Sequence, residues 1–145
     1  MNISTKTAAN SEDLKINVKL KLSALWVAFM FLYIYADILS LFQPGTVEEL
    51  RTGSLEGIQF TQELLFGAAI LVTIPGVMVF LSLALKPRAN RWANIILGLA
   101  YTGVNIANLL SFDDPWAFII FFHIAECVIA LLIARYAWQW PQLER

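Results

Sequence analysis

Charged and metal-binding side chains are scarce in this sequence. Charged residues make up 14% of the chain, whereas soluble domains carry about 25%. The formal net charge is −1, so the chain lacks the basic surplus that nucleic-acid binding requires, and we expect no nucleic-acid partner. A single cysteine excludes an internal disulfide, and a single histidine provides only one axial ligand for haem. We therefore predict neither a metal nor a cofactor.

Apolar residues, by contrast, are abundant and occur in long runs. The hydrophobic share is 59% and the mean hydropathy is +0.65. An α-helix needs about 20 apolar residues to cross roughly 30 Å of hydrocarbon. Four runs approach this length, and they predict transmembrane helices over 22–42, 63–85, 92–110 and 116–138. Runs of this length exclude the strands of a membrane β-barrel, so the predicted fold is an all-α integral membrane protein.

The connecting segments are short. We expect a cytoplasmic tail over 1–21, an outer loop over 43–62, a cytoplasmic turn over 86–91, an outer turn over 111–115 and a cytoplasmic end over 139–145. In the outer loop, Thr46 and Glu49 have the spacing of a capping box, which predicts a short helix. Short connections favour antiparallel neighbours, so the sequence predicts an up-down-up-down four-helix bundle.

Lysine and arginine set the predicted orientation in the membrane. All Lys and Arg residues except Arg51 fall at the end of the predicted bundle that holds the tail, the 86–91 turn and the C-terminus. They are Lys6, Lys15, Lys19, Lys21, Lys86, Arg88, Arg91, Arg135 and Arg145. By the positive-inside rule, both termini should be cytoplasmic and the lipid bilayer should be the main partner. No cleavage pattern follows the first run closely, so we expect it to be an uncleaved first span.

Three stretches of the sequence carry a resemblance to a known family. "YADILS" (35–40), "NRWANII" (90–96) and "RYAWQW" (135–140) resemble an uncharacterised bacterial family of small four-span membrane proteins. The resemblance implies a location in the bacterial inner membrane. It implies no catalytic residue, because that family has no established activity. The layout also looks, more distantly, like that of the DoxX-like four-helix membrane proteins, some of which are linked to quinone-coupled redox complexes.

Polar residues inside the predicted helices follow stripes with alternating steps of three and four residues. Side chains on such a stripe share one face of a helix. Asp37 lies on the stripe of the first helix, Asn105 and Asn108 on that of the third, and His123 and Glu126 on that of the fourth. With a rise of about 1.5 Å per residue, they fall between the midplane and about 10 Å to its outer side. We therefore expect the outer half of the bundle to hold nearly all the buried polar groups and the inner half to be dry.

An ionisable side chain at this depth needs a partner or a proton. An uncompensated Asp costs about 2.5–3.5 kcal/mol at the centre of a transmembrane helix, and such residues are usually functional. Our leading hypothesis is a small-molecule or proton-linked site formed by Asp37, Asn105, Asn108, His123 and Glu126, which the 43–62 loop would cover. The sequence contains no credible catalytic triad, so we do not predict an enzyme. The alternative is a purely structural hydrogen-bond network.

Two other classes of function stay open. In a quinone-linked redox subunit, Tyr33, Tyr101 and Trp116 would contact a ring together with His123. In an accessory or assembly protein, a membrane partner would pack a helix on the small residues of Ala130-x-x-x-Ala134. A homodimer is also natural, since four helices are few for a transport pathway.

Overall fold

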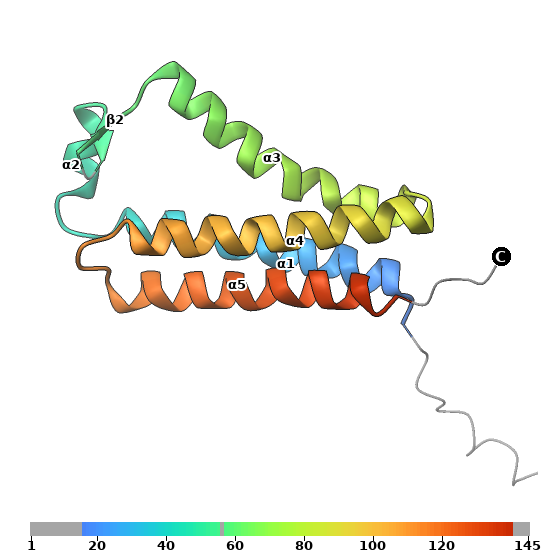
Figure 1. Cartoon of the computed structure of the whole chain (residues 1–145). Helices are drawn as coiled ribbons and strands as arrows, with labels where there is room; N and C mark the ends of the chain where they lie inside the picture. Colours follow the sequence, from blue (N-terminus) through green and yellow to red (C-terminus); the bar gives the residue numbers. More distant parts are fainter. Residues whose placement is uncertain (1–15, 56, 141–145) are drawn as a thin grey trace, which may run out of the picture.

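The computed structural model describes residues 16–55 and 57–140, most of which are helical (Figure 1). The elements in chain order are α1 (Val18–Ser40), α2 (Thr46–Arg51), β1 (Ser54–Leu55), β2 (Ile58–Gln59), α3 (Gln62–Ala84), α4 (Pro87–Leu110) and α5 (Ala117–Trp138). In this part of the chain, four helices are long and apolar enough to cross a membrane, namely α1, α3, α4 and α5. The two short strands pair antiparallel after α2.

Consecutive long helices run in opposite directions (Figure 1). The described chain therefore begins and ends at the same end of the molecule, beside the turn between α3 and α4; we call this the terminal end. The opposite end carries α2, β1, β2 and residues 111–116, and we call it the loop end. These two names locate the polar groups described below.

Local interactions explain where the long helices begin. The side chains of Asn17 and Thr61 each accept a hydrogen bond from a backbone N–H of the first turn of α1 and α3. α4 begins at Pro87, because proline fits the first helical position, where no N–H partner is needed. Residues 87–91, which we expected in a turn, are therefore helical.

The short helix α2 lies within the predicted outer loop, but the predicted capping box is wrong. Thr46 is the first helical residue, and Gly45, which precedes it, makes no side-chain cap. Gly45 has a φ of 89°, in the left-handed region that glycine adopts without steric cost. The start of α2 thus depends on the conformational freedom of a glycine.

Three helices, α1, α4 and α5, form the closely packed part of the molecule. Trp26 and Phe29 of α1 are fully buried in one cluster with Tyr101 of α4. The helices α4 and α5 approach so closely at Gly98 that a Cβ there would lie 2.7 Å from the carbonyl oxygen of Ala130. Ala130 and Ala134 are buried at this contact. The suggestion that Ala130-x-x-x-Ala134 receives a partner helix is therefore wrong, because α4 already covers it.

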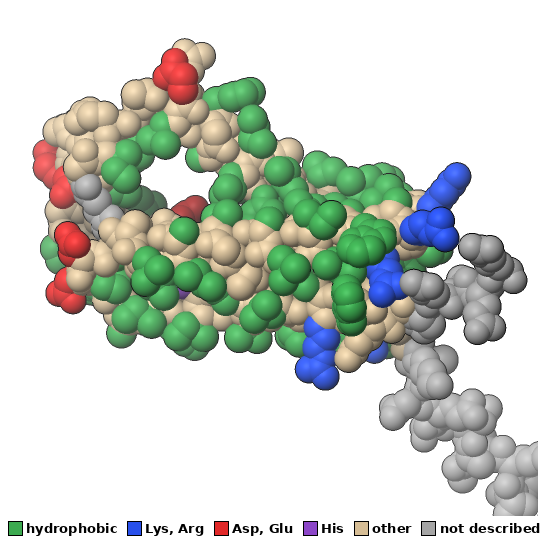
Figure 2. Space-filling view, in the orientation of Figure 1, with side chains coloured by type: hydrophobic (Ala, Val, Ile, Leu, Met, Phe, Trp, Pro, Cys, Tyr) green, Lys and Arg blue, Asp and Glu red, His purple; other side chains and the backbone are tan. Residues whose placement is uncertain are grey.

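The helix α3 is packed against the others at one end only. Towards the terminal end, Met78 and Ser82 are buried, and Ser23 Oγ of α1 donates a hydrogen bond of 2.8 Å to the carbonyl of Val79. From residue 62 to residue 70, every residue is exposed. Towards the loop end α3 leans away from α1 and α4 (Figure 1), and an opening is visible there in the space-filling view (Figure 2). The bundle is therefore open on one side.

Pro75 explains why Tyr101 of α4 makes a hydrogen bond to the backbone of α3 near the point where α3 leaves the bundle. α3 continues through Pro75, which has no N–H and cannot bond to the carbonyl of Leu71 one turn earlier. The hydroxyl of Tyr101 on α4 donates a hydrogen bond to that carbonyl, with 2.5 Å between the oxygens. A carbonyl without a hydrogen-bond partner is costly where water does not reach it, so the tyrosine compensates for the proline.

Candidate functional site

A polar network lies near the terminal end, where the sequence predicted a dry interior. Asn94 Oδ1 accepts a hydrogen bond of 2.7 Å from Trp26 Nε1, and Asn94 Nδ2 donates one of 2.6 Å to Asn90 Oδ1. Asn90 Nδ2 donates to the carbonyl of Ser82 at 2.5 Å. We call these four residues the terminal network. The prediction of a dry inner half is wrong, because Asn90 was expected in a turn and lies in the first turn of α4.

The terminal network is fully bonded. Asn90, Asn94 and Ser82 are completely buried, yet among the described residues none of their side-chain polar atoms lacks a hydrogen-bond partner. The network joins α1, α3 and α4. Lys19 Nζ adds hydrogen bonds to the last carbonyls of α3, at 3.0 Å from Leu83 O and 2.8 Å from Leu85 O. These contacts attach α3 to the bundle, which is a structural role.

A second polar cluster lies nearer the loop end and includes the predicted site residues. The hydroxyl of Tyr33 donates to Asn105 Oδ1 at 2.5 Å, and Asn108 Nδ2 lies 3.1 Å from His123 Nε2. Asn105, His123 and Glu126 are buried, with exposed fractions of 1%, 7% and 2%. We call the six residues of this region the loop-end cluster: Tyr33, Asp37, Asn105, Asn108, His123 and Glu126. It draws on α1, α4 and α5.

Buried polar atoms of the loop-end cluster lack partners. Among the described residues, Asn105 Nδ2 and His123 Nδ1 are buried without a hydrogen bond. The backbone of Ile119 lies near the His123 ring, but Nδ1 does not reach hydrogen-bond geometry with it. When Asn108 Nδ2 donates to Nε2, a neutral His123 carries its proton on Nδ1, so a donor is left over. Such atoms are unusual in a native interior.

Two carboxyl groups complete the cluster. Glu126 is buried and Asp37 is exposed, and neither makes a hydrogen bond or an ion pair with another described residue. They lie close enough to interact electrostatically with each other and with Tyr33. Asp37 lies one turn beyond Tyr33 on the same face of α1, in the half of the molecule where α3 leans away. Two ionised carboxyl groups placed in this way repel each other.

The aromatic residues that we considered for a quinone ring are not gathered around His123. Tyr101 bonds to Leu71, and its ring packs edge-on against Trp26. Trp116 is half-exposed and lines a separate pocket. The ring that packs against His123 is that of Phe112, with 6.1 Å between centroids. Sequence reasoning missed Phe112, because it lies in the short link 111–115, outside the helical stripes.

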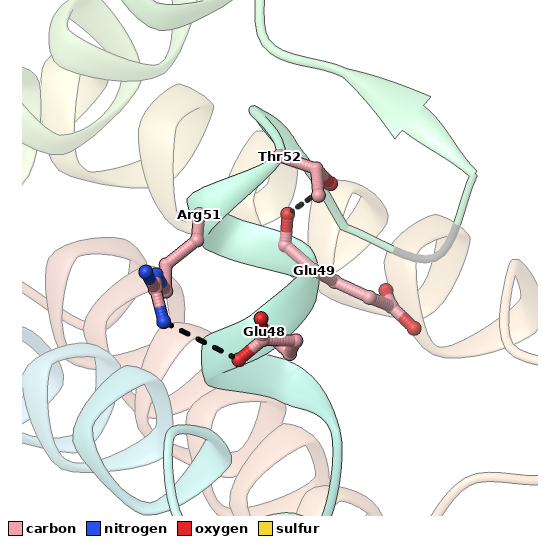
Figure 3. Close-up of polar contacts among 4 residues, drawn as sticks. All are labelled: Glu48, Glu49, Arg51 and Thr52. Carbon is pink, nitrogen blue, oxygen red and sulfur yellow. Dashed lines mark hydrogen bonds and ion pairs between the residues drawn. The ribbon is translucent and has the colours of Figure 1, made fainter.

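The separate pocket lies at the loop end and has a volume of about 200 Å³. Its walls include Thr46 and Glu49 of α2, Asp114 and Trp116 of the segment before α5, and Ile119 in the first turn of α5. On α2, Arg51 Nη1 lies 3.7 Å from Glu48 Oε2, and the Thr52 hydroxyl donates to the Glu49 carbonyl at 2.7 Å (Figure 3). The 43–62 loop thus covers the segment before α5.

Among the described residues, no group of three His, Cys, Asp or Glu side chains could hold a metal ion.

Comparisons with known proteins identify a family and no activity. No curated protein and no solved structure matches the chain. Residues 12–145 match the family described as Family of unknown function (DUF6326). Because this match covers nearly the whole sequence, the chain belongs to that family of unknown function.

Proposed function

We propose that the protein is a multi-pass protein of the bacterial inner membrane, with both termini in the cytoplasm, and that the loop-end cluster is a small-molecule or proton-linked site. Large apolar side chains such as Phe66 and Leu110 are 68% and 78% exposed, and lipid would cover them. Lys and Arg gather at the terminal end, whereas acidic groups dominate the loop end (Figure 2). This distribution supports a cytoplasmic terminal end.

The contrast between the two polar groups supports a functional site. Both contain buried asparagines among apolar helices, although Asp37 and Asn108 of the loop-end cluster are exposed. In the terminal network the buried polar atoms are paired, whereas Asn105 Nδ2 and His123 Nδ1 of the loop-end cluster are not, and Glu126 has no hydrogen-bond partner among the described residues. A network that only stabilised the fold would resemble the first group. Unpaired groups decrease stability, and proteins keep them where they bind something.

The other classes of function have less support. A quinone-linked redox role would need the aromatic residues to surround one ring, and Tyr101 and Trp116 lie in different places. An accessory role through Ala130-x-x-x-Ala134 would need a surface that α4 already covers. A homodimer is compatible with the proposed site.

Stability measurements distinguish a functional cluster from a structural one. Removing a buried carboxyl group that has no partner eliminates its desolvation cost, so Glu126→Met should stabilise the protein by about 1–3 kcal/mol. Asn94→Leu is the matched control in the terminal network. It leaves Trp26 Nε1 and Asn90 Oδ1 with fewer partners, so it should destabilise the protein by about 1–3 kcal/mol.

The measurement is the thermal unfolding midpoint of each purified variant in nanodiscs. A higher midpoint for Glu126→Met and a lower one for Asn94→Leu would support the proposal. If Glu126→Met lowers the midpoint as much as Asn94→Leu does, the loop-end cluster is a structural network and the proposed function is wrong.

A further inference from the structure

We propose that the ligand of the loop-end cluster is a lipophilic organic cation, which reaches Glu126 and Asp37 from the membrane through the opening between α3 and α4. This inference rests on the proposed function and adds the chemical class of the ligand and its route. The charges near the site, the aromatic residues beside it and the shape of the opening each support it.

The carboxyl groups of the cluster have no cationic partner in the described part of the chain. Most described Lys and Arg side chains lie at the terminal end, and Arg51 at the loop end pairs with Glu48 on the surface of α2. The same end also carries Glu48, Glu49, Asp113 and Asp114. An acidic end raises the local concentration of cations. A bound cation would neutralise carboxylates that the protein itself leaves unpaired.

The aromatic cluster of the core extends to the carboxyl groups through Tyr33. Tyr33 lies within electrostatic range of both Asp37 and Glu126. Its ring packs against that of Phe29, with 4.8 Å between centroids, and Phe29 contacts Tyr101 edge-on. The faces of such rings attract cations, the more so away from water. The carboxyl groups would therefore bind the charge of an organic cation, and the Tyr33 ring would contact its apolar groups.

The opening favours a ligand that is soluble in lipid. The loop-end half of α3 presents exposed apolar side chains, among them Leu64, Leu65, Phe66 and Ile70. In the space-filling view, apolar side chains border the opening and an acidic side chain is visible within it (Figure 2). A hydrophilic ligand would lose its hydration along this route, whereas a lipophilic cation already resides in the membrane.

Binding of the cation requires an ionised carboxyl group. When Glu126 is protonated, it must release its proton before it can pair with the cation, and one proton leaves for each charge bound. The other titratable groups within electrostatic range of Glu126 are Asp37 and Tyr33 on α1 and Cys127 on α5. Tyr101 on α4 lies within range of Tyr33, and His123 lies one turn before Glu126 on the same face of α5. Cation binding should therefore weaken as the pH falls.

The test compares two ions of the same shape and opposite charge, tetraphenylphosphonium and tetraphenylborate. Equilibrium dialysis measures their binding to the full-length protein in nanodiscs, with empty nanodiscs as the blank. We expect saturable binding of tetraphenylphosphonium alone, with proton release in weakly buffered solution. Glu126→Gln should weaken this binding at least tenfold, and Glu126→Asp should retain part of it. Glu63→Gln, which removes an exposed carboxylate in the first turn of α3, should leave it unchanged.

The outcomes separate this inference from the proposed function. If both ions bind equally, or if Glu126→Gln leaves tetraphenylphosphonium binding intact, the cation hypothesis is wrong. If neither ion binds but Glu126→Met stabilises the protein, the site stands and its ligand belongs to another class. If Glu126→Gln does not fold, the test uses the tetraphenylphosphonium binding and the proton release of Glu126→Asp. If both equal those of the wild type, the inference is wrong.

Discussion

At the scale of single residues, two glycines of α4 show that the same residue type has different roles at two positions. A Cβ on Gly98 would lie 2.7 Å from the backbone oxygen of Ala130 and 3.2 Å from the Cβ of Ala134, whereas a Cβ on Gly103 would meet nothing within 4 Å. The first distance is shorter than real contacts allow, and the atom it meets belongs to the backbone. Gly98 therefore sets how closely α4 and α5 pack.

Gly98→Ala should destabilise the protein, because α4 and α5 must separate to admit the methyl group. We expect a loss of about 1–3 kcal/mol, as for overpacked cores. Gly103→Ala, in the same helix, should be neutral or stabilise by up to about 1 kcal/mol, because alanine is the better helix former. Unfolding midpoints of the two variants test this pair. Equal effects at both positions would show that the close approach at Gly98 has no energetic weight.

Sequence spacing identified much of the polar interior but not its hydrogen bonds. The steps of three and four placed Asp37, Asn105, Asn108, His123 and Glu126 on inward stripes. Asn105, His123 and Glu126 are buried, whereas Asp37 and Asn108 are exposed. The same spacing could not show that Asn94 is fully bonded while Asn105 keeps an unpaired Nδ2. That difference depends on which residues face them from other helices, and a stripe on one helix carries no such information.

At the scale of the helices, the bond between Tyr101 and Leu71 offers a test of why α3 tolerates Pro75. Tyr101→Phe leaves the Leu71 carbonyl without its partner, so it should destabilise the wild-type protein by about 1–2 kcal/mol. In a Pro75→Ala protein the restored N–H bonds to that carbonyl within α3. The same Tyr101→Phe change should then cost clearly less.

A double-mutant cycle measures this coupling through the unfolding midpoints of the four proteins. Tyr33→Phe is the matched control, since it also removes a phenolic hydroxyl, but one that bonds to Asn105 and not to α3. Its effect should be the same with either residue at position 75. An equal cost of Tyr101→Phe in both backgrounds would mean that the tyrosine does not compensate for the proline.

Hydropathy predicted that these helices exist, because runs of about 20 apolar residues have few alternatives in lipid. It did not predict that α3 leans away, since α3 is apolar on all sides and its sequence shows no inward stripe. Its position depends instead on the bonds that it receives from Lys19, Ser23 and Asn90, which all act near the terminal end. Such partners are known only once the fold is known.

At the scale of the whole molecule, the separation of charge predicts which end faces the cytoplasm. Arg88 lies at the terminal end and Asp113 at the loop end, and the positive-inside rule places Arg88 inside. In a Cys127→Ser background, a membrane-impermeant maleimide should label Asp113→Cys in intact bacterial cells, and Arg88→Cys only after lysis. The opposite labelling pattern would invert the topology and place the loop-end cluster in the cytoplasmic half. Labelling of both positions in intact cells would show that the chain lacks a single orientation.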